Sequence, residues 1–179
     1  MDYTEQPVRR IGTYEGVIVD LTEDMVRLPN GEITIREVVH HPGGVCVAAV
    51  DEDGTVALVR QYRFPFGEHL LELPAGKLEK GEEPLPAAKR ELSEETGLEA
   101  DVWQDLGAIY TSPGFSTETL YLYLATGLHQ GQAHPDPNEF LDVERMSLSQ
   151  LVDLVEKGTV KDAKTVVGAL KVAAILGRN

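Results

Sequence analysis

Residues 76–98 read GKLEKGEEPLPAAKRELSEETGL, and this stretch carries the strongest structural signal in the chain. Residues 84–96 predict a helix, because proline is tolerated in a first helical turn and Pro84 stands at its start. Gly97 suits the position just beyond a helix C-terminus, where a left-handed backbone conformation is common. The segment is therefore expected to contain one helix with a defined beginning and a defined end.

Three glutamates share one face of this helix. Glu91, Glu94 and Glu95 stand at positions i, i+3 and i+4, so that their carboxylates come close together. Three apolar residues fall on a neighbouring face, turned by roughly 100°: Leu85, Ala88 and Leu92. We therefore expect one side of the helix to pack into a core while another side presents three carboxylates.

Grouping these carboxylates has an energetic cost. Repulsion between like charges at this spacing costs roughly a few tenths of a kcal/mol per pair on an exposed helix. Divalent cations would explain the grouping, because Mg²⁺ prefers carboxylate oxygen and usually binds alongside substrate phosphates. A solvated acidic face, partly compensated by Lys89 and Arg90, is the competing interpretation. The helix alone does not decide between the two.

The spacing of the whole segment favours the metal site, because it resembles the signature of the Nudix hydrolases. That signature is a glycine, five residues, a glutamate, seven residues, Arg-Glu, an aliphatic residue, any residue, Glu-Glu, any residue, a glycine and an aliphatic residue. Every specified position is filled: Gly76, Glu82, Arg90, Glu91, Leu92, Glu94, Glu95, Gly97 and Leu98. From average residue usage, such a match arises by chance on the order of 10⁻⁹ per starting position.

The resemblance implies a Nudix-type α/β/α sandwich with a mixed central sheet. This agrees with the α+β class that the irregular mixture of strands and helices suggests. It also implies hydrolysis of a nucleoside diphosphate linked to another group, with Mg²⁺, Mn²⁺ or another divalent ion as cofactor. Residues 1–42 are expected to form N-terminal antiparallel strands that serve as a dimerisation subdomain. Residues 43–179 are expected to form the hydrolase domain.

The resemblance also assigns roles to individual residues. Glu91 and Glu95 are implied as the principal metal ligands, Glu94 as a ligand or close support, and the backbone carbonyl of Ala75 as a further ligand. Arg90 is implied to belong to the catalytic group by orienting the glutamates through salt bridges, and Glu82 is implied to brace the preceding loop. In relatives that cleave ADP-ribose, a glutamate on a distant loop often activates the water. The resemblance makes Glu139 the candidate base, with Asp136 as the second candidate.

Features outside the signature resemble the ADP-ribose pyrophosphatase branch of the family. They are VRQYR at 59–63, LELPAG at 71–76 and SPGF at 112–115, where Pro113 is the fifteenth residue after Leu98. Arg60 or Arg63 could pair with phosphate oxygens, and at least one of them could instead bond Glu72 or the other glutamates. Glu72 could bind ribose or close an ion pair. The remaining substrate-binding candidates are Tyr14 and Arg36 for the nucleobase, together with Pro113 and Phe115.

Other functions remain open at this point. Another nucleotide sugar such as GDP-mannose, a dinucleoside polyphosphate or a dinucleotide such as NADH could be the substrate. A module that binds ADP-ribose without cutting it is a rival from a different class, although such modules usually lose signature glutamates. A third possibility is an inert acidic scaffold. In the ADP-ribose branch the N-terminal strands commonly form a homodimer, in which Tyr14 or Arg36 would act across the interface.

Composition excludes several classes of partner. The formal net charge of −14 argues against non-specific binding to nucleic acid, which needs a basic surface. No stretch approaches the roughly 18 apolar residues that span a bilayer, and no signal peptide is expected from MDYTEQPVRR. The single cysteine, Cys46, lies in the apolar run GVCVAAV and is expected to be a buried structural thiol. A cytoplasmic protein without membrane partners is therefore expected.

Periodicity and turn formers predict the remaining elements. Strands are expected at residues 14–21, 32–40, 44–50, 55–62, 70–73, 102–111, 118–126 and 140–146. A helix is expected to open with the capping-box pattern at residues 147–150 and to end at Gly158. A last helix is expected at residues 163–176, where apolar residues repeat at helical spacing.

Overall fold

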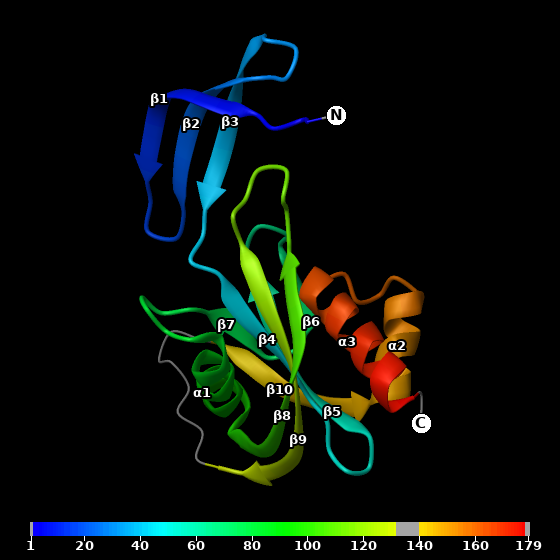
Figure 1. Ribbon diagram of the computed structural model, residues 1–179. Helices are drawn as coiled ribbons and strands as arrows, with labels where there is room; N and C mark the ends of the chain where they lie inside the picture. Colours follow the sequence, from blue (N-terminus) through cyan, green and yellow to red (C-terminus); the bar gives the residue numbers. More distant parts are fainter. Residues whose placement is uncertain (1, 132–139, 178–179) are drawn as a thin grey trace. The chain divides into compact units, whose positions relative to one another are not determined.

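The computed structural model describes residues 2–131 and 140–177, which divide into two compact units (Figure 1). The first unit comprises Met1–Gly43 and Tyr110–Thr119, and the second comprises Gly44–Ile109 and Leu120–Asn179. The strands are β1 (Gln6–Glu15), β2 (Asp20–Arg27), β3 (Ile33–His40), β4 (Gly44–Ala49), β5 (Thr55–Arg63), β6 (Glu68–Glu72), β7 (Ala75–Lys77), β8 (Leu98–Tyr110), β9 (Thr119–Gln130) and β10 (Leu141–Ser147). The helices are α1 (Pro84–Thr96), α2 (Leu148–Glu156) and α3 (Ala163–Leu176).

Strand β4 is the centre of the second unit. Every residue of its apolar run GVCVAA is buried, as expected of a strand that packs on both faces. Because side chains alternate along a strand, Val45 and Val47 pack in one apolar cluster with residues of α1. Cys46 and Ala48 pack on the opposite face with residues of α2 and α3. The second unit is therefore an α/β/α sandwich, which confirms the predicted fold class.

Two sheets form the middle layer of this sandwich. One has the strand order β7-β4-β9-β8, and in it β4 is antiparallel to β7 and parallel to β9. This is the mixed sheet that was predicted. The other has the order β10-β5-β6, with antiparallel pairing on both sides of β5. Residues 73–74 join β6 to β7 and so connect the two sheets directly.

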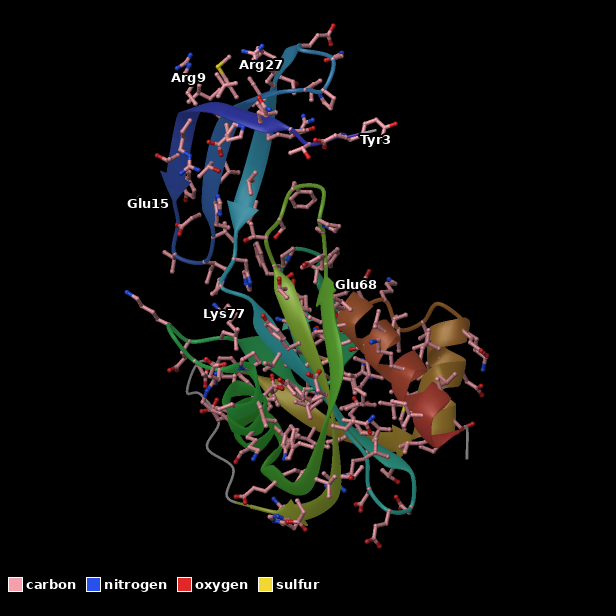
Figure 2. The ribbon with its side chains drawn as sticks, in the orientation of Figure 1. Tyr3, Arg9, Glu15, Arg27, Glu68 and Lys77 are labelled. Carbon is pink, nitrogen blue, oxygen red and sulfur yellow. The ribbon has the colours of Figure 1, made fainter. Side chains whose placement is uncertain are left out.

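The first unit is built on an antiparallel sheet in the order β1-β2-β3. Strand β1 is exposed along nearly its whole length. The segment Tyr110–Thr119 pairs with β3, because the Val39 N–H donates to the Phe115 carbonyl and the Thr117 N–H donates to the Val39 carbonyl. The sheet also exposes apolar side chains: Val8, Ile11, Ile33 and Ile35. Figure 2 shows side chains standing out from both faces of these strands.

The helix boundaries follow from local capping. Gly97 adopts a left-handed conformation (φ 68°) and its N–H donates to the Ser93 carbonyl, which ends α1 at the predicted residue. Ser147 and Gln150 form the predicted capping box of α2. Asp162 caps α3 by accepting a hydrogen bond from the Thr165 N–H. None of the helices in the described part of the chain combines the length and apolar character that a membrane crossing needs.

One expectation about local structure is wrong. The strand predicted at residues 14–21 is instead the end of β1, a turn at residues 16–19 and the start of β2, and in the turn the Gly16 N–H donates to the Val19 carbonyl. Its β-branched residues are exposed turn residues rather than one face of a strand, and Val17 is fully exposed. Strand β7 was not predicted, because three residues are too few to show a periodicity. In the loop between β5 and β6, Phe64 and Phe66 are 85% and 73% exposed.

The thiol of Cys46 is buried, as predicted. Burial raises its pKa to about 12, because the apolar surroundings disfavour the thiolate. The thiol therefore remains protonated at neutral pH and contributes to packing alone.

Thr165 provides a test of how α3 is fixed to the strands. Its fully buried hydroxyl accepts a hydrogen bond from the Leu73 N–H at 2.8 Å and donates to Asp162 Oδ2 at 2.6 Å. Thr165→Val keeps the shape of the side chain but leaves a buried N–H without its acceptor. We expect the free energy of unfolding in urea to fall by about 1–3 kcal/mol. Thr159→Val, at an exposed threonine after α2, is the matched control, and an equal loss in both variants would contradict this role.

Candidate active site

Helix α1 carries two of the three predicted ligands on its buried side. Glu91 and Glu95 are only 8% and 6% exposed, whereas the Glu94 side chain is 34% exposed. The expectation that all three carboxylates lie on a face apart from the core is therefore wrong. The physical reason is the i+4 ridge of the helix, on which Glu91 and Glu95 follow the buried residue Ala87.

Gly76 on β7 makes room for one of these buried carboxylates. A Cβ atom built at this residue would lie 2.0 Å from both Cδ and Oε1 of Glu91. Any side chain at residue 76 would therefore displace the carboxylate from the backbone of β7. This close approach gives a physical reason for the first glycine of the signature.

Arg90 connects the loop before α1 to the glutamates of the helix. Its Nε and Nη2 donate to the two carboxylate oxygens of Glu82 at 3.0 and 2.9 Å. Its Nη1 donates to Glu91 Oε1 at 2.7 Å and to Glu94 Oε2 at 2.9 Å. The hydrogen bonds that Arg90 donates to Glu82 and then to Glu91 raise the pKa of Arg90, while the guanidinium holds the pKa of Glu82 below its usual range. Arg90 therefore forms ion pairs with Glu82, Glu91 and Glu94, and its place in the catalytic group stays a prediction.

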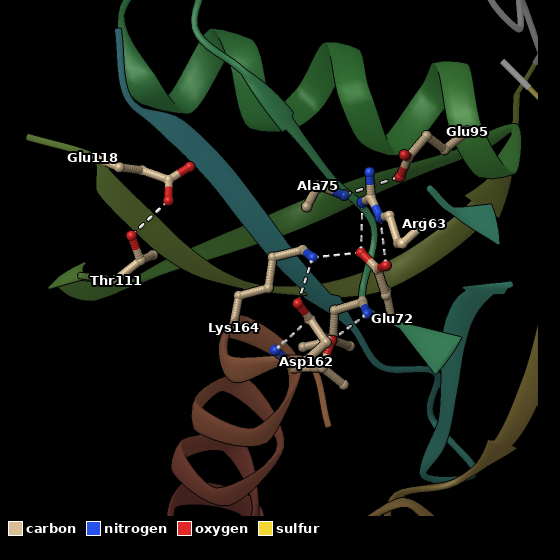
Figure 3. Close-up of polar contacts among 10 residues, drawn as sticks. Arg63, Glu72, Ala75, Glu95, Thr111, Glu118, Asp162 and Lys164 are labelled. Atoms are coloured by element: carbon tan, nitrogen blue, oxygen red, sulfur yellow. Dashed lines mark hydrogen bonds and ion pairs between the residues drawn. The ribbon is translucent and has the colours of Figure 1, made fainter. Parts of the chain in front are cut away.

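Glu95 is held from the other side, by the strand. The Ala75 N–H donates to Glu95 Oε2 at 2.9 Å, which fixes the carboxylate beside the first residue of β7 (Figure 3). The backbone of Ala75 and the glutamates of α1 are therefore brought together by the fold. From the sequence, this proximity was expected only because of the resemblance to the Nudix signature.

These groups fit a divalent cation by their chemistry. Three carboxylates on neighbouring turns of one helix, with a backbone carbonyl nearby, are the hard oxygen donors that Mg²⁺ prefers. Within residues 2–131 and 140–177, however, no three His, Cys, Asp or Glu side chains are grouped closely enough to form a ready metal centre. The hydrogen bonds just described explain why the carboxylates stand apart. The carboxylates of Glu91 and Glu94 accept from Arg90, and that of Glu95 accepts from the Ala75 N–H.

Arg63 lies near these glutamates and is held by a second cluster of charges. Its Nε and Nη2 donate to the two oxygens of Glu72, both at 2.7 Å (Figure 3). Lys164 Nζ donates to the same carboxylate at 2.5 Å. Burial of Glu72 favours its neutral form, but the Arg63 hydrogen bonds and the Lys164 charge outweigh this and lower its pKa. Of the two alternatives for Glu72, the structure shows the ion pair, and Arg63 is the arginine that makes it.

Arg60 has a different partner. Its Nε and Nη2 both donate to the carboxylate of Glu144 on β10, directly across from β5 in the same sheet. This hydrogen bond to Glu144 raises the pKa of Arg60. Arg60 is therefore paired through the same edge, Nε and Nη2, that Arg63 uses for Glu72, and its predicted contact with substrate phosphate stays a prediction.

Four predicted substrate-binding residues belong to the first unit. Tyr14, at the end of β1, is 64% exposed and lines a cavity of about 250 Å³ within that unit. Arg36 on β3 forms an ion pair with Glu5 at 2.5 Å. Pro113 and Phe115 lie in the segment between β8 and β9, and Phe115 is 57% exposed. Their roles in binding remain predictions.

The predicted base, Glu139, and its alternative, Asp136, lie outside the described residues. Two residues of the second charge cluster, Asp162 and Lys164, were not predicted from the sequence. A signal for Asp162 was present, because an aspartate directly before a helical apolar stripe is a typical N-cap. No sequence signal shows that Lys164 reaches Glu72, which is 92 residues away in the chain.

Comparison with known proteins places this site in a family. The NUDIX domain model matches residues 40–167. An ADP-ribose pyrophosphatase of Bacillus subtilis (strain 168) is 42% identical over 163 residues, covering 90% of this chain and 88% of the relative. An ADP-ribose pyrophosphatase of Mycobacterium tuberculosis (strain ATCC 25618 / H37Rv) is 40% identical over 166 residues, covering 90% and 80%. A methanol dehydrogenase activator of Bacillus methanolicus is 40% identical over 167 residues, covering 92% and 90%. With a complete signature on α1 and a family match over most of its length, the chain belongs to the Nudix family.

Proposed function

We propose that the chain hydrolyses the diphosphate bond of ADP-ribose and releases AMP and ribose 5-phosphate in a reaction that requires Mg²⁺. The observation that carries this proposal is the site around α1, where the signature is complete from Gly76 to Leu98 and Arg90 and Gly76 arrange the glutamates. The two pyrophosphatases that resemble this chain over 90% of its length support ADP-ribose as the substrate. A complete set of glutamates favours an enzyme over a module that only binds.

The residues that would hold the cation are Glu91, Glu94, Glu95 and the carbonyl of Ala75. A bound divalent ion supplies neutralisation of the diphosphate charge and polarisation of phosphorus toward attack. Arg90 keeps Glu91 and Glu94 within reach of one another, because one of its nitrogens donates to both. The protein thus supplies the oxygen donors from one helix and the adjoining strand, and binding of the ion would turn carboxylate oxygens from Arg90 and the Ala75 N–H toward the metal.

We assign two further roles to residues of this chain. Arg63 binds a phosphate oxygen of the substrate, because its side chain is 39% exposed and only one edge of it is used by Glu72. Glu139 accepts the proton of the attacking water, with Asp136 as the alternative. The water oxygen bonds to one phosphorus as the bridging P–O bond breaks, and the departing phosphate carries the electron pair.

We further propose a cytoplasmic homodimer. Residues 1–42 would be the dimerisation subdomain, and Tyr14 and Arg36 would serve nucleobase binding across the interface. Exposed apolar side chains on the N-terminal sheet support this, because such surface usually marks an interaction site. A single cysteine kept as a protonated thiol fits a reducing compartment. A monomer in sedimentation velocity at micromolar concentration, or recovery of the native protein outside the cytoplasm, would contradict these assignments.

The products and substrate preference give the direct test of function. Incubation with ADP-ribose and millimolar Mg²⁺ should yield AMP and ribose 5-phosphate in equal amounts, and the metal chelator EDTA should stop the reaction. The ratio kcat/KM should be higher for ADP-ribose than for GDP-mannose, diadenosine polyphosphates and NADH. A higher ratio for one of these would keep the reaction and change the substrate. Binding without any product would identify a recognition module instead.

Glu95 provides a test of the metal site. Glu95→Gln removes one ligand charge and also relieves repulsion with the neighbouring glutamates, so the fold should be retained. We expect kcat to fall by at least about 100-fold, since even the loss of an outer partner of a metal ligand typically costs 10- to 100-fold. Glu83→Gln is the matched control, because Glu83 is exposed at the start of the same helix and its side chain makes no cap hydrogen bond. Wild-type turnover in Glu95→Gln would remove Glu95 from the site.

Glu139 is tested by separating chemistry from metal binding. Glu139→Gln should slow kcat by about 10²- to 10⁴-fold, the usual contribution of general-base catalysis. The Mg²⁺ concentration that gives half-maximal rate should stay within about twofold, because Glu139 is proposed as a base and not as a ligand. An unchanged kcat would transfer the role to Asp136 or to another group.

A further inference from the structure

Four charged side chains meet where the N-terminus of α3 approaches the end of β6. They are Arg63, Glu72, Asp162 and Lys164, here called the α3 charge cluster (Figure 3). Lys164 Nζ donates to Glu72 at 2.5 Å and to Asp162 at 2.9 Å. Asp162 in turn caps α3 through Thr165, so the lysine is anchored to the first turn of the helix. Two positive and two negative charges make the cluster neutral.

The lysine of this cluster is costly for the fold. The Lys164 side chain is 11% exposed and the Glu72 side chain is 2% exposed. Burying a charge costs free energy unless it is paired, and a buried ion pair is often no more stable than apolar residues of similar volume. Burial favours the neutral amine, but Asp162 and Glu72 outweigh this and raise the pKa of Lys164, so it stays charged. Stability alone therefore does not account for a cation at residue 164.

Arg63 connects the cluster to the candidate active site. Glu72 occupies the edge of the guanidinium that carries Nε and Nη2. In the described part of the chain, the hydrogen bonds that the structure shows for Arg63 use Nε and Nη2 and do not involve Nη1. The charge of Glu95 also contributes to the raised pKa of Arg63, after the larger effects of Glu72 and Asp162, so the guanidinium lies within electrostatic range of α1. Arg63 thus has one edge fixed by Glu72 and another available to an anion beside the glutamates.

We propose that Lys164 is a positioning residue for substrate binding, which acts through Glu72 to keep Arg63 available to the diphosphate. This inference rests on the proposed function for the identity of the ligand. Lys164 supplies a second positive charge beside Glu72, so the charge of this carboxylate is not compensated by Arg63 alone. Without the lysine, Arg63, Glu72 and Asp162 carry a net charge of −1 next to the place where an anion must bind. The guanidinium would then be neutralised by Glu72 and would attract phosphate oxygen less strongly.

A double-mutant cycle separates this role from a purely structural one. The dissociation constant of the α,β-methylene analogue of ADP-ribose, which cannot be hydrolysed, is measured by calorimetry in millimolar Mg²⁺. The proteins are the wild type, Arg63→Met, Lys164→Met and the double variant. Lys164→Met should weaken binding roughly tenfold in the wild-type background, whereas in the Arg63→Met background it should change binding by less than about twofold. Equal weakening in both backgrounds, or none in the wild type, overturns the inference.

Lys161→Met is the matched control. Lys161 lies three residues before Lys164 and pairs at 2.9 Å with Glu68, which is on the same strand as Glu72, but its side chain is 61% exposed. Its loss should leave the dissociation constant within about twofold of wild type, because a surface ion pair contributes little. Thermal unfolding establishes that each variant is folded. Should Lys164→Met fail to fold, Lys164→Gln is used in the same cycle, because its amide keeps a donor for Glu72 and removes the charge.

The wild-type protein separates the two proposals. If it binds the analogue but releases no AMP from ADP-ribose, the proposed function fails and the cycle still decides the role of Lys164. If it hydrolyses ADP-ribose and the two substitutions are additive, only the role of Lys164 is overturned. If it does not bind the analogue at all, both proposals are overturned.

Discussion

The pairing of buried carboxylates on α1 is the interaction on which the rest of the structure depends. Glu91 and Glu95 are almost fully buried, and a buried carboxylate is tolerated only when it is paired or hydrogen-bonded. Arg90 meets this requirement for Glu91 and also joins it to Glu94 and Glu82. The Ala75 N–H contributes a hydrogen bond to Glu95. Acidic side chains are thereby concentrated in one place, although their mutual repulsion opposes it.

The central strand β4 fixes the position of α1 relative to α2 and α3. Strand β4 packs on α1 with one face and on α2 and α3 with the other, so the three layers share one central strand. The chain from Glu72 to Ala75 leads from one sheet to the other. At its first residue it meets Lys164 of α3, and at its last it meets Glu95 of α1. Two helices on opposite faces of the sandwich therefore each bind one end of the four-residue segment from Glu72 to Ala75.

Local features of the structure could be predicted from the sequence. The bounds of α1 and α3 follow from proline, glycine and apolar spacing within a few residues, and the capping box of α2 depends on Ser147 and Gln150 alone. The turn at residues 16–19 was mistaken for a strand, because β-branched residues are typical of strands whether or not they are exposed.

The partners of the charged residues could not be predicted in the same way. Arg60 and Arg63 lie on the same strand, three residues apart. One pairs with Glu144, 84 residues away, and the other with Glu72, nine residues away. These choices depend on which strands become neighbours, and sequence spacing does not contain that information. The burial of Glu91 and Glu95 depends likewise on how α1 is rotated against β4 and β7, which apolar spacing alone did not determine.

Anomalous diffraction from crystals soaked in Mn²⁺ tests the central claim most directly. Mn²⁺ takes the same oxygen ligands as Mg²⁺ and can be located without any assumption about the substrate. The account predicts an anomalous peak within coordination distance of Glu91, Glu95 and the carbonyl of Ala75, with Arg90 still paired to Glu82. Crystals saturated with Mn²⁺ that show no peak beside α1, with and without a bound diphosphate, would contradict it.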